Sequence, residues 1–221
     1  MPRQARIVLP DIAHHITQRG NYRQKVFGSD SDYKQYCEWV NEYSEEYKVA
    51  IIGYCLMSNH VHFIARPEKE DGLARLFNTL HMRYSQYINR RRRAKGHLWQ
   101  GRFYSCLLNE QHLYRAVRYV ENNPVRAKIV KKAWDHEWSS CKDHAGLREK
   151  PLVKTTEYKG TNKVDWKVYL EEEDEVLIAD IRLKTQRGLA VGTEKFITKI
   201  ESTLNRSLEC LNPGRPKKEK E

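Results

Sequence analysis

Two adjacent runs of strand-forming residues constrain the fold of this chain more than any other feature of its sequence. Residues 49–57 (VAIIGYCLM) and 60–65 (HVHFIA) are rich in β-branched and aromatic side chains, and only Ser58 and Asn59 separate them. Two strands joined by so short a polar turn form a hairpin. Pro67 ends the second strand, because proline cannot donate a ladder hydrogen bond. We therefore expect a sheet built around this hairpin.

The segments on either side of the hairpin alternate between strand and helix patterns. Apolar residues recur at helical spacing in three of them, and two short runs have strand character. The predicted elements, besides the hairpin, are a strand at 14–19, a helix at 30–48, a helix at 72–93, a strand at 103–108 and a helix at 111–123. This order predicts an α/β (α+β) fold, namely a ferredoxin-like split βαβ antiparallel sheet with helices on one face.

The pattern weakens after Cys141, where polar and turn-forming residues become frequent. Short amphipathic helices are predicted near 174–186 and 194–205. The predicted organisation is a catalytic domain at 1–145, a connector at 146–170, a helical C-terminal extension at 171–212 and a disordered basic tail at 213–221.

Positive charge dominates the chain, which has 40 Lys and Arg residues against 29 Asp and Glu residues, a net charge of +11. Between Leu73 and Asn109 no acidic residue occurs, and aromatic residues are interleaved with basic ones. Cations for phosphates and aromatic faces for bases are typical of a surface for single-stranded nucleic acid. The basic residues of this surface that we expect to contact DNA are Arg83, Arg90, Arg91, Arg92, Arg93, Lys95 and Arg102, together with Arg19 and Asn21 near the first strand.

No apolar stretch approaches the ~20 residues of a membrane span. The five cysteines are scattered and include no CxxC pair, so neither a disulfide framework nor a zinc ribbon is indicated. A cytoplasmic protein is expected.

The pair His60 and His62 is the sharpest local signal. Residues i and i+2 of a strand share a face, so both imidazoles point one way while Val61 and Phe63 point towards the helices. Two imidazoles on one face can contribute to a divalent metal site, but a third ligand must come from elsewhere. Because HxH is common in strands, an ordinary structural role for the pair stays open.

A second candidate constellation lies on the helix at 111–123. Arg115, Tyr119 and Asn123 follow one another at intervals of four residues and therefore share one helix face. Pro124 disfavours helical geometry at Asn123, which places this amide at the helix end. A tyrosine on an amphipathic helix is usually a packing residue, so the pattern alone leaves both interpretations open.

Four segments resemble the REP-associated tyrosine transposases, relatives of the HUH single-tyrosine transposases of simple insertion sequences. They cover the first 140 residues in order and at family-like separations. The segments are 13–27 (AHHITQRGNYRQKVF), 54–67 (YCLMSNHVHFIARP), 97–105 (HLWQGRFYS) and 118–130 (RYVENNPVRAKIV). Residues 181–196 also resemble a C-terminal extension of some members.

The resemblance implies a role for each matching residue. Tyr119 would be the nucleophile, His60 and His62 the paired metal ligands, and Asn123 the third ligand. The implied ion is Mg²⁺ or Mn²⁺. The implied reaction is nicking and strand transfer through a 5′-phosphotyrosine at REP-like hairpin DNA with a single-stranded flank. Because a free phenol has a pKa of about 10, we expect the metal and Arg115 to assist Tyr119. The resemblance favours a nucleoid-associated bacterial protein that acts as a monomer rather than a homodimer.

Three alternatives remain at this point. A ferredoxin-like nucleic-acid-binding regulator with an inactive or repurposed site would share the basic surface but give the histidines and Tyr119 no joint task. A replication-initiator nickase often carries two active tyrosines, but Tyr114 lies about 140° around the helix from Tyr119. A hydrolytic metallonuclease would leave no covalent adduct.

Overall fold

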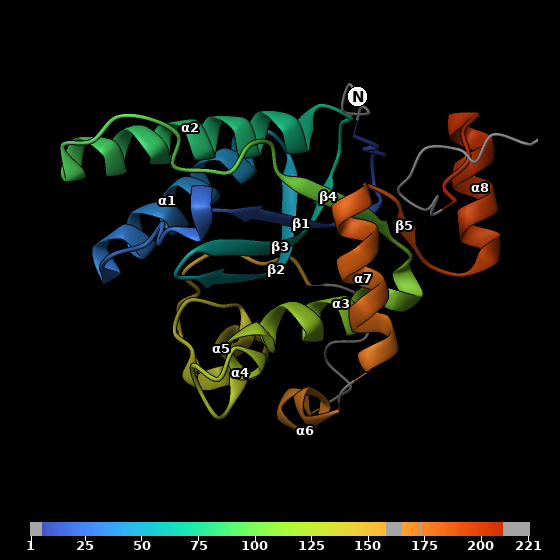
Figure 1. The fold of residues 1–221 in the computed structure, drawn as a ribbon. Helices are drawn as coiled ribbons and strands as arrows, with labels where there is room; N and C mark the ends of the chain where they lie inside the picture. Colours follow the sequence, from blue (N-terminus) through green and yellow to red (C-terminus); the bar gives the residue numbers. More distant parts are fainter. Residues whose placement is uncertain (1–5, 158–164, 173, 210–221) are drawn as a thin grey trace, which may run out of the picture.

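The computed structural model describes residues 6–157, 165–172 and 174–209. The fold is of the mixed α/β type, with a five-stranded sheet that has helices on both sides (Figure 1). The strands are β1 (Ala13–Arg19), β2 (Val49–Met57), β3 (His60–Pro67), β4 (Tyr104–Leu108) and β5 (Ala190–Val191). The longer helices are α1 (Asp30–Glu46), α2 (Gly72–Arg92), α3 (Glu110–Glu121), α7 (Glu175–Arg187) and α8 (Glu194–Leu204). The short ones are η1 (Asn21–Arg23), α4 (Asn123–Arg126), η2 (Ala133–Asp135), α5 (Cys141–His144) and α6 (Trp166–Glu171).

The sheet has the strand order β2-β3-β1-β4-β5. β1 pairs antiparallel with β3 on one side and with β4 on the other, and β3 pairs antiparallel with β2. Helix α1 joins β1 to β2, and β3 lies between these two strands. This is the predicted ferredoxin-like split βαβ arrangement, which the structure confirms. The register sets Thr17 of β1 opposite His62 of β3.

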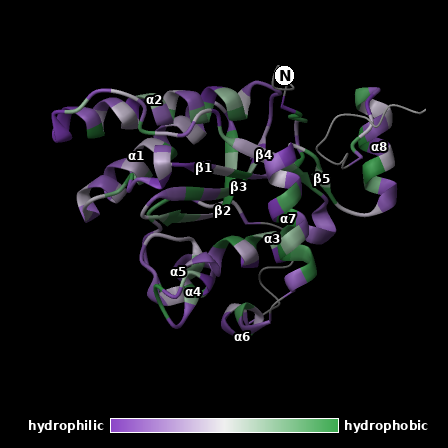
Figure 2. Cartoon of the chain, viewed as in Figure 1, coloured by the Kyte–Doolittle hydropathy of each residue, from purple (hydrophilic) through white to green (hydrophobic). Residues whose placement is uncertain are grey.

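Helices cover both faces of the sheet, which corrects the prediction that they would lie on one face. On one face α1 and α2 pack over side chains that include Ile16, Val61 and Phe63. On the other, α3 and α7 pack over Ile52, Ile64 and Cys106, and α6 packs against α3. Strands β2 and β3 are buried along nearly their whole length, so both of their faces require a cover. In Figure 2 parts of the sheet between the helices are green, that is, hydrophobic.

Local signals set the ends of the helices around the sheet. Ser29 begins α1 with a capping box, in which the Asp32 carboxylate accepts hydrogen bonds from the Gly28 and Ser29 N–H groups at 2.8 and 3.0 Å. Helix α2 ends at Arg93, whose left-handed φ of 48° closes its last turn. Asn109 caps α3 by accepting from the Gln111 N–H. These bounds lie within two residues of those predicted.

The segment predicted as a connector packs on the domain before it. Val153 is fully buried in the core under α1, and the Thr156 N–H donates to the Ile51 carbonyl oxygen at 2.7 Å. The C-terminal extension is helical as predicted, and it also adds β5 to the sheet edge, parallel to β4. The predicted tail at 213–221 lies outside the described residues. Among the residues described, none of the helices combines the length and apolar character needed to cross a membrane.

Several histidines in the interior are held in their neutral form. Burial, with the nearby charge of Arg6 second, lowers the pKa of His81 to about 3. Burial also lowers the pKa of His14 to about 4, although a hydrogen bond to the Ile12 carbonyl opposes the shift. An unfolded histidine titrates near pH 6.5. The stability that these rings contribute is therefore fully present above pH 6.5 and is lost as the pH falls towards their folded pKa values.

We expect the free energy of unfolding to fall steeply as the pH is lowered from 7 to 5. His81→Gln keeps a polar partner for the Tyr36 hydroxyl, which lies 3.0 Å from His81 Nε2, but removes one proton-binding site from the unfolded chain. The slope should therefore be shallower by about 1.4 kcal/mol per pH unit below pH 6.5. Urea unfolding at a series of pH values measures this slope. His97→Gln, at an exposed position, is the control. Parallel curves for the wild type and His81→Gln would contradict the prediction.

Candidate active site

The hairpin of β2 and β3 places two histidines on the sheet face under α3. Val61 and Phe63 are buried against α1 and α2, as predicted, and the alternation of the strand directs His60 and His62 to the opposite face. His62 is buried, and His60, next to the Ser58-Asn59 turn, is half-buried. The predicted shared face of the pair is thus present in the structure.

A third histidine, which the sequence analysis missed, lies against this pair. His15 of β1 stacks on His62 with ring centroids 5.2 Å apart, and His15 Nε2 lies 2.9 Å from His62 Nδ1. His15 Nδ1 lies in turn 2.7 Å from the Thr185 hydroxyl of α7. The alternation of β1 was the available signal, because it sets His15, Thr17 and Arg19 on one face. Only the register of β1 against β3 shows that this face adjoins His62.

Hydrogen bonds orient both candidate ligands. His60 Nδ1 lies 2.6 Å from the Asn59 side-chain oxygen, and His62 Nδ1 is paired with His15. Each imidazole therefore retains Nε2 as the atom that can bind a metal ion. A ligating histidine usually has its second ring nitrogen engaged in this way, which fixes the ring orientation.

Burial keeps these imidazoles neutral at physiological pH. It lowers the pKa of His15 to about 3 and, with the charge of Arg19 second, lowers that of His60 to about 4. Burial and then the neighbouring His60 and His15 hold the pKa of His62 well below its usual range. Metal ions bind the neutral form of imidazole, so the rings are in the ligating state without competition from protons.

Helix α3 brings Tyr119 to the histidines. The side chain of Tyr119 is only 5% exposed, and its ring meets His15 and His62 edge-on at centroid distances of 5.6 and 6.0 Å. The apolar face of α3 packs on the sheet through Leu113, Ala116, Val117 and Val120, which fixes the rotation of the helix. This rotation directs Tyr119 over the histidine face.

Asn123 occupies the end of the same helix ridge and offers an oxygen atom to the site. Its side-chain nitrogen donates to the carbonyl oxygens of Tyr119 at 3.2 Å and Val120 at 3.0 Å. Both neighbours are acceptors, so the nitrogen must face them and Oδ1 must face away. The structure therefore brings together His60, His62, Tyr119 and Asn123, which all line one hollow of about 330 Å³.

The predicted role of Arg115 does not agree with its position. Its guanidinium is half exposed, lies 3.5 Å from the Asp174 carboxylate and does not line the hollow that holds the histidines. The cations over the Tyr119 ring are instead Arg126 and Arg182, at 4.6 and 5.8 Å from its centroid. Arg115 shares a helix face with Tyr119 but lies one turn earlier, outside the hollow that holds the histidines. Arg126 follows the helix break, and Arg182 comes from α7.

The predicted DNA-contacting residues divide into two groups. Arg83 is held by Glu42 and lies over the Trp39 ring, and Arg91 is held by Asp32 at 2.8 Å. Arg92 donates to the Lys25 carbonyl oxygen. Arg83, Arg91 and Arg92 therefore already have partners within the protein. Arg90, Arg93 and Lys95, which are exposed at the end of α2 and in the loop after it, make up the second group.

Arg19 and the loop after α2 extend this basic surface to the hollow. Arg19 lines the hollow beside His60, and its carbonyl oxygen accepts from the Gln100 N–H at 2.9 Å. The Asn21 N–H donates to Leu98 in the same loop. Next to Asn21, Tyr22 has a left-handed φ of 50° and is 94% exposed, a candidate base-stacking residue that the sequence analysis missed. Arg102 lies elsewhere, beside Arg6.

Comparison with known proteins finds one matching family and similar solved structures. The model of the family described as "Transposase IS200 like" matches residues 9–123, just over half of the chain, and this segment includes both histidines and Tyr119. A solved structure of a REP-associated tyrosine transposase bound to a REP hairpin is similar at 18% identity and a TM-score of 0.58, covering 72% of this chain and 96% of that chain. A candidate transposase from Deinococcus radiodurans R1 is 15% identical with a TM-score of 0.38, covering 55% of this chain and 97% of that chain. None of the curated proteins matches the chain.

The exposed basic end of α2 should supply phosphate contacts without sequence preference. Arg90→Ala, Arg93→Ala and Lys95→Ala together should weaken binding to every single-stranded DNA about equally. They should also flatten the dependence of affinity on salt, by roughly 0.7 in the log–log slope for each lost contact. Fluorescence anisotropy titrations at several salt concentrations measure both quantities. The control removes the same number of positive charges elsewhere on the surface, by replacing the exposed residues Lys34, Lys69 and Lys150 with alanine. A slope equal to that of the control would place these three residues outside the DNA interface.

Proposed function

Because the chain belongs to the IS200-like transposase family, we propose that it cuts and rejoins single-stranded DNA through a covalent bond between Tyr119 and a DNA 5′ phosphate. The observation that carries the proposal is the position of Tyr119. Its ring contacts His15 and His62 edge-on, and the guanidinium groups of Arg126 and Arg182 lie 4.6 and 5.8 Å from the ring centroid. A merely structural tyrosine would not need this polar and cationic surrounding.

The proposed reaction exchanges one phosphodiester for another. The Tyr119 oxygen attacks the phosphorus in line, a tyrosyl phosphoester bond forms, and the bond between phosphorus and the 3′ oxygen breaks. The 3′ oxygen leaves with the bonding electron pair and gains a proton, and the phenol loses one. Arg126 and Arg182 stabilise negative charge on the phenol oxygen and the phosphate. Because no bond energy is lost, the 3′ hydroxyl of another strand can reverse the step without ATP.

A divalent cation of the Mg²⁺ or Mn²⁺ type fits the residues of the hollow. His60 Nε2, His62 Nε2 and Asn123 Oδ1 would hold it, and water would complete its coordination. The described residues contain no group of three or more His, Cys, Asp and Glu side chains suited to a metal ion. We therefore propose the amide oxygen of Asn123, which lines the same hollow, as the third protein ligand. When bound, the ion supplies Lewis-acid polarisation of the non-bridging phosphate oxygens.

The proposed substrate is hairpin DNA with a single-stranded flank. The similar solved structure is described as bound to a REP hairpin, and the net charge of +11 suits a polyanionic partner. The exposed cations at the end of α2 and Arg19 at the hollow would carry the backbone contacts. We propose that the protein acts as a monomer at the bacterial nucleoid.

Tyr119→Phe should abolish cleavage and leave DNA binding within about twofold, because only the attacking oxygen is removed and the ring still packs. The assay incubates the protein with labelled single-stranded genomic repeats and Mn²⁺, then separates denatured products to detect a protein–DNA adduct. Tyr114→Phe is the matched control, because Tyr114 packs against Trp166 and Tyr169 away from the hollow. Cleavage by Tyr119→Phe without an adduct would show a hydrolytic mechanism. Binding with no cleavage by the wild type would indicate a DNA-binding regulator.

His60→Ala combined with His62→Ala should remove Mn²⁺-dependent cleavage, while binding to hairpin DNA in the presence of EDTA should persist. Asn123→Ala should shift the Mn²⁺ requirement to higher concentration, because the ion loses one of three protein ligands. Cleavage rates over a series of MnCl₂ concentrations measure these effects, and thermal melting checks that each variant folds. An unchanged Mn²⁺ requirement in Asn123→Ala would assign the third ligand to another group.

A further inference from the structure

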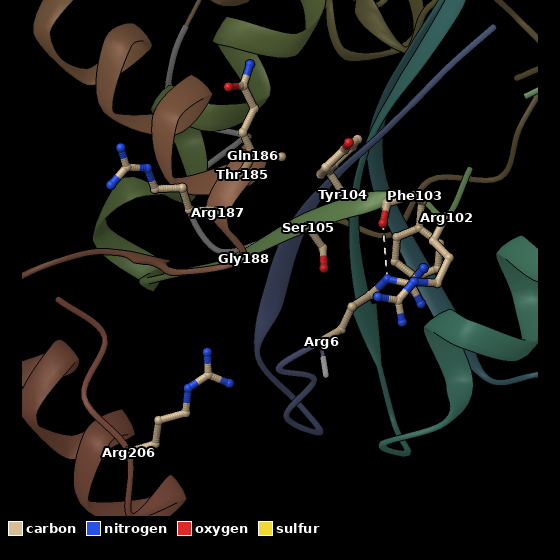
Figure 3. Close-up of a pocket in the computed structure, with 10 residues that line it drawn as sticks. All are labelled: Arg6, Arg102, Phe103, Tyr104, Ser105, Thr185, Gln186, Arg187, Gly188 and Arg206. Carbon is tan, nitrogen blue, oxygen red and sulfur yellow. Dashed lines mark hydrogen bonds between the residues drawn. The ribbon is translucent and has the colours of Figure 1, made fainter. Parts of the chain in front are cut away.

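A second hollow, of about 340 Å³, lies between β4 and the C-terminal extension and is lined by four arginines. Arg6 and Arg102 lie on one side of it, and Arg187 and Arg206 on the other (Figure 3). Among the described residues that line it, none is an aspartate or a glutamate. Arg6, Arg187 and Arg206 lie outside the segment matched by the family model, whereas Arg102 lies inside it. Three of the four arginines therefore come from parts of the chain that the family model does not cover.

Arg6 is positioned to bind an anion. Its Nε donates to the Phe103 carbonyl oxygen at 3.1 Å, and its guanidinium lies 3.7 Å from the Phe103 ring centroid. Arg6 Nη2 is buried and has no hydrogen-bond partner among the described residues. Burial and the nearby charge of Arg102 lower the pKa of Arg6 to about 10, so the guanidinium remains charged at neutral pH. A buried, unsatisfied donor on a cation is costly unless a ligand completes it.

The edge of β4 adds main-chain and aromatic groups to the same hollow. The Leu107 N–H points outward to the Leu189 carbonyl oxygen, and the alternation of the strand directs the Ser105 N–H to the same side. Because β5 pairs only with Leu107 and Leu108, the Ser105 main chain lies on the uncovered part of the edge. Tyr104, at 40% exposed, also lines the hollow and presents a ring on which a base can stack.

The arginine hollow adjoins the catalytic hollow. Thr185 and Gln186, in the last turn of α7, line both of them. Arg182, one turn earlier on α7, lies over the Tyr119 ring. A DNA strand that leaves Tyr119 and passes this turn therefore reaches the four arginines.

We propose that the arginine hollow binds the sugar–phosphate backbone of single-stranded DNA that flanks the cleavage site, with Arg6 and Arg102 on a phosphate and Tyr104 against a base. This inference rests on the proposed function for the identity of the strand. The proposal adds a second phosphate-binding site, which needs Arg6, Arg187 and Arg206 in addition to Arg102. Planar guanidinium groups suit phosphate oxygens because they can donate two parallel hydrogen bonds.

The test measures binding of fluorescein-labelled (dT)15 by full-length protein carrying Tyr119→Phe, so that it requires no cleavage. Adding Arg6→Gln and Arg102→Gln should weaken binding about tenfold and reduce the log–log salt slope by roughly 0.7, which corresponds to the one phosphate that the two arginines share. The control pair, Lys69→Gln and Arg75→Gln, removes the same charge from the exposed start of α2 and should have a much smaller effect. A second pair, Arg187→Gln and Arg206→Gln, provides the same test if the first lowers the melting temperature.

Inorganic pyrophosphate is titrated in parallel to separate a strand site from a site for small anions. Binding of (dT)15 that falls in both arginine pairs but not in the control supports the proposal. Affinity and slope equal to the control overturn it, as does an arginine-dependent pyrophosphate affinity combined with unchanged (dT)15 binding. These outcomes do not depend on adduct formation by the wild type. Failure of the proposed function and failure of this inference are therefore distinguishable.

Discussion

The buried carboxylate of Glu121 fixes the helix that carries the candidate nucleophile. It is fully buried and accepts hydrogen bonds from three parts of the chain: the Ser140 hydroxyl at 2.5 Å, His144 at 2.7 Å and the Trp166 indole at 2.7 Å. Burial opposes protonation of His144, but the charge of Glu121 outweighs it and raises the pKa of His144. Removing one partner of such a buried network leaves a charge uncompensated, which costs about 3–5 kcal/mol. Because Tyr119 lies two residues before Glu121, this anchor also holds the phenol against the histidines.

Most of the fold follows from patterns that are local in the sequence. The Ser58-Asn59 turn between two apolar runs identifies the hairpin, and period-two alternation assigns His60 and His62 to one face. Helix spacing likewise aligns Tyr119 with Asn123. The second layer of helices was missed because an apolar strand does not reveal whether one or both of its faces are covered. Helix α7 of that layer belongs to the C-terminal extension, whose sequence pattern is weak.

The rest of the candidate site depends on contacts between distant segments. His15 becomes part of it only through the register of β1 against β3, and Arg182 only through the docking of α7. Charge patterns are limited in the same way. The run of basic residues after Leu73 predicted a continuous interface, yet Arg83 and Arg91 are neutralised by acids of α1 that lie about 40 to 60 positions away in the sequence. Spacing along one segment cannot disclose which cations acquire partners in the folded chain.

The contribution of α7 to the hollow that contains Tyr119 has a consequence for the order in which the parts of this hollow are made. Tyr119 leaves the ribosome 63 residues before Arg182, since 182 − 119 = 63. At roughly 5–20 residues per second this interval lasts about 3 to 13 s. During that time the nascent chain carries the phenol and both hairpin histidines, but lacks Arg182, one of the two arginines over the ring, and Thr185, which is hydrogen-bonded to His15. A site that draws on α7 as well as on the hairpin and α3 is therefore complete only after residue 185 has been synthesised.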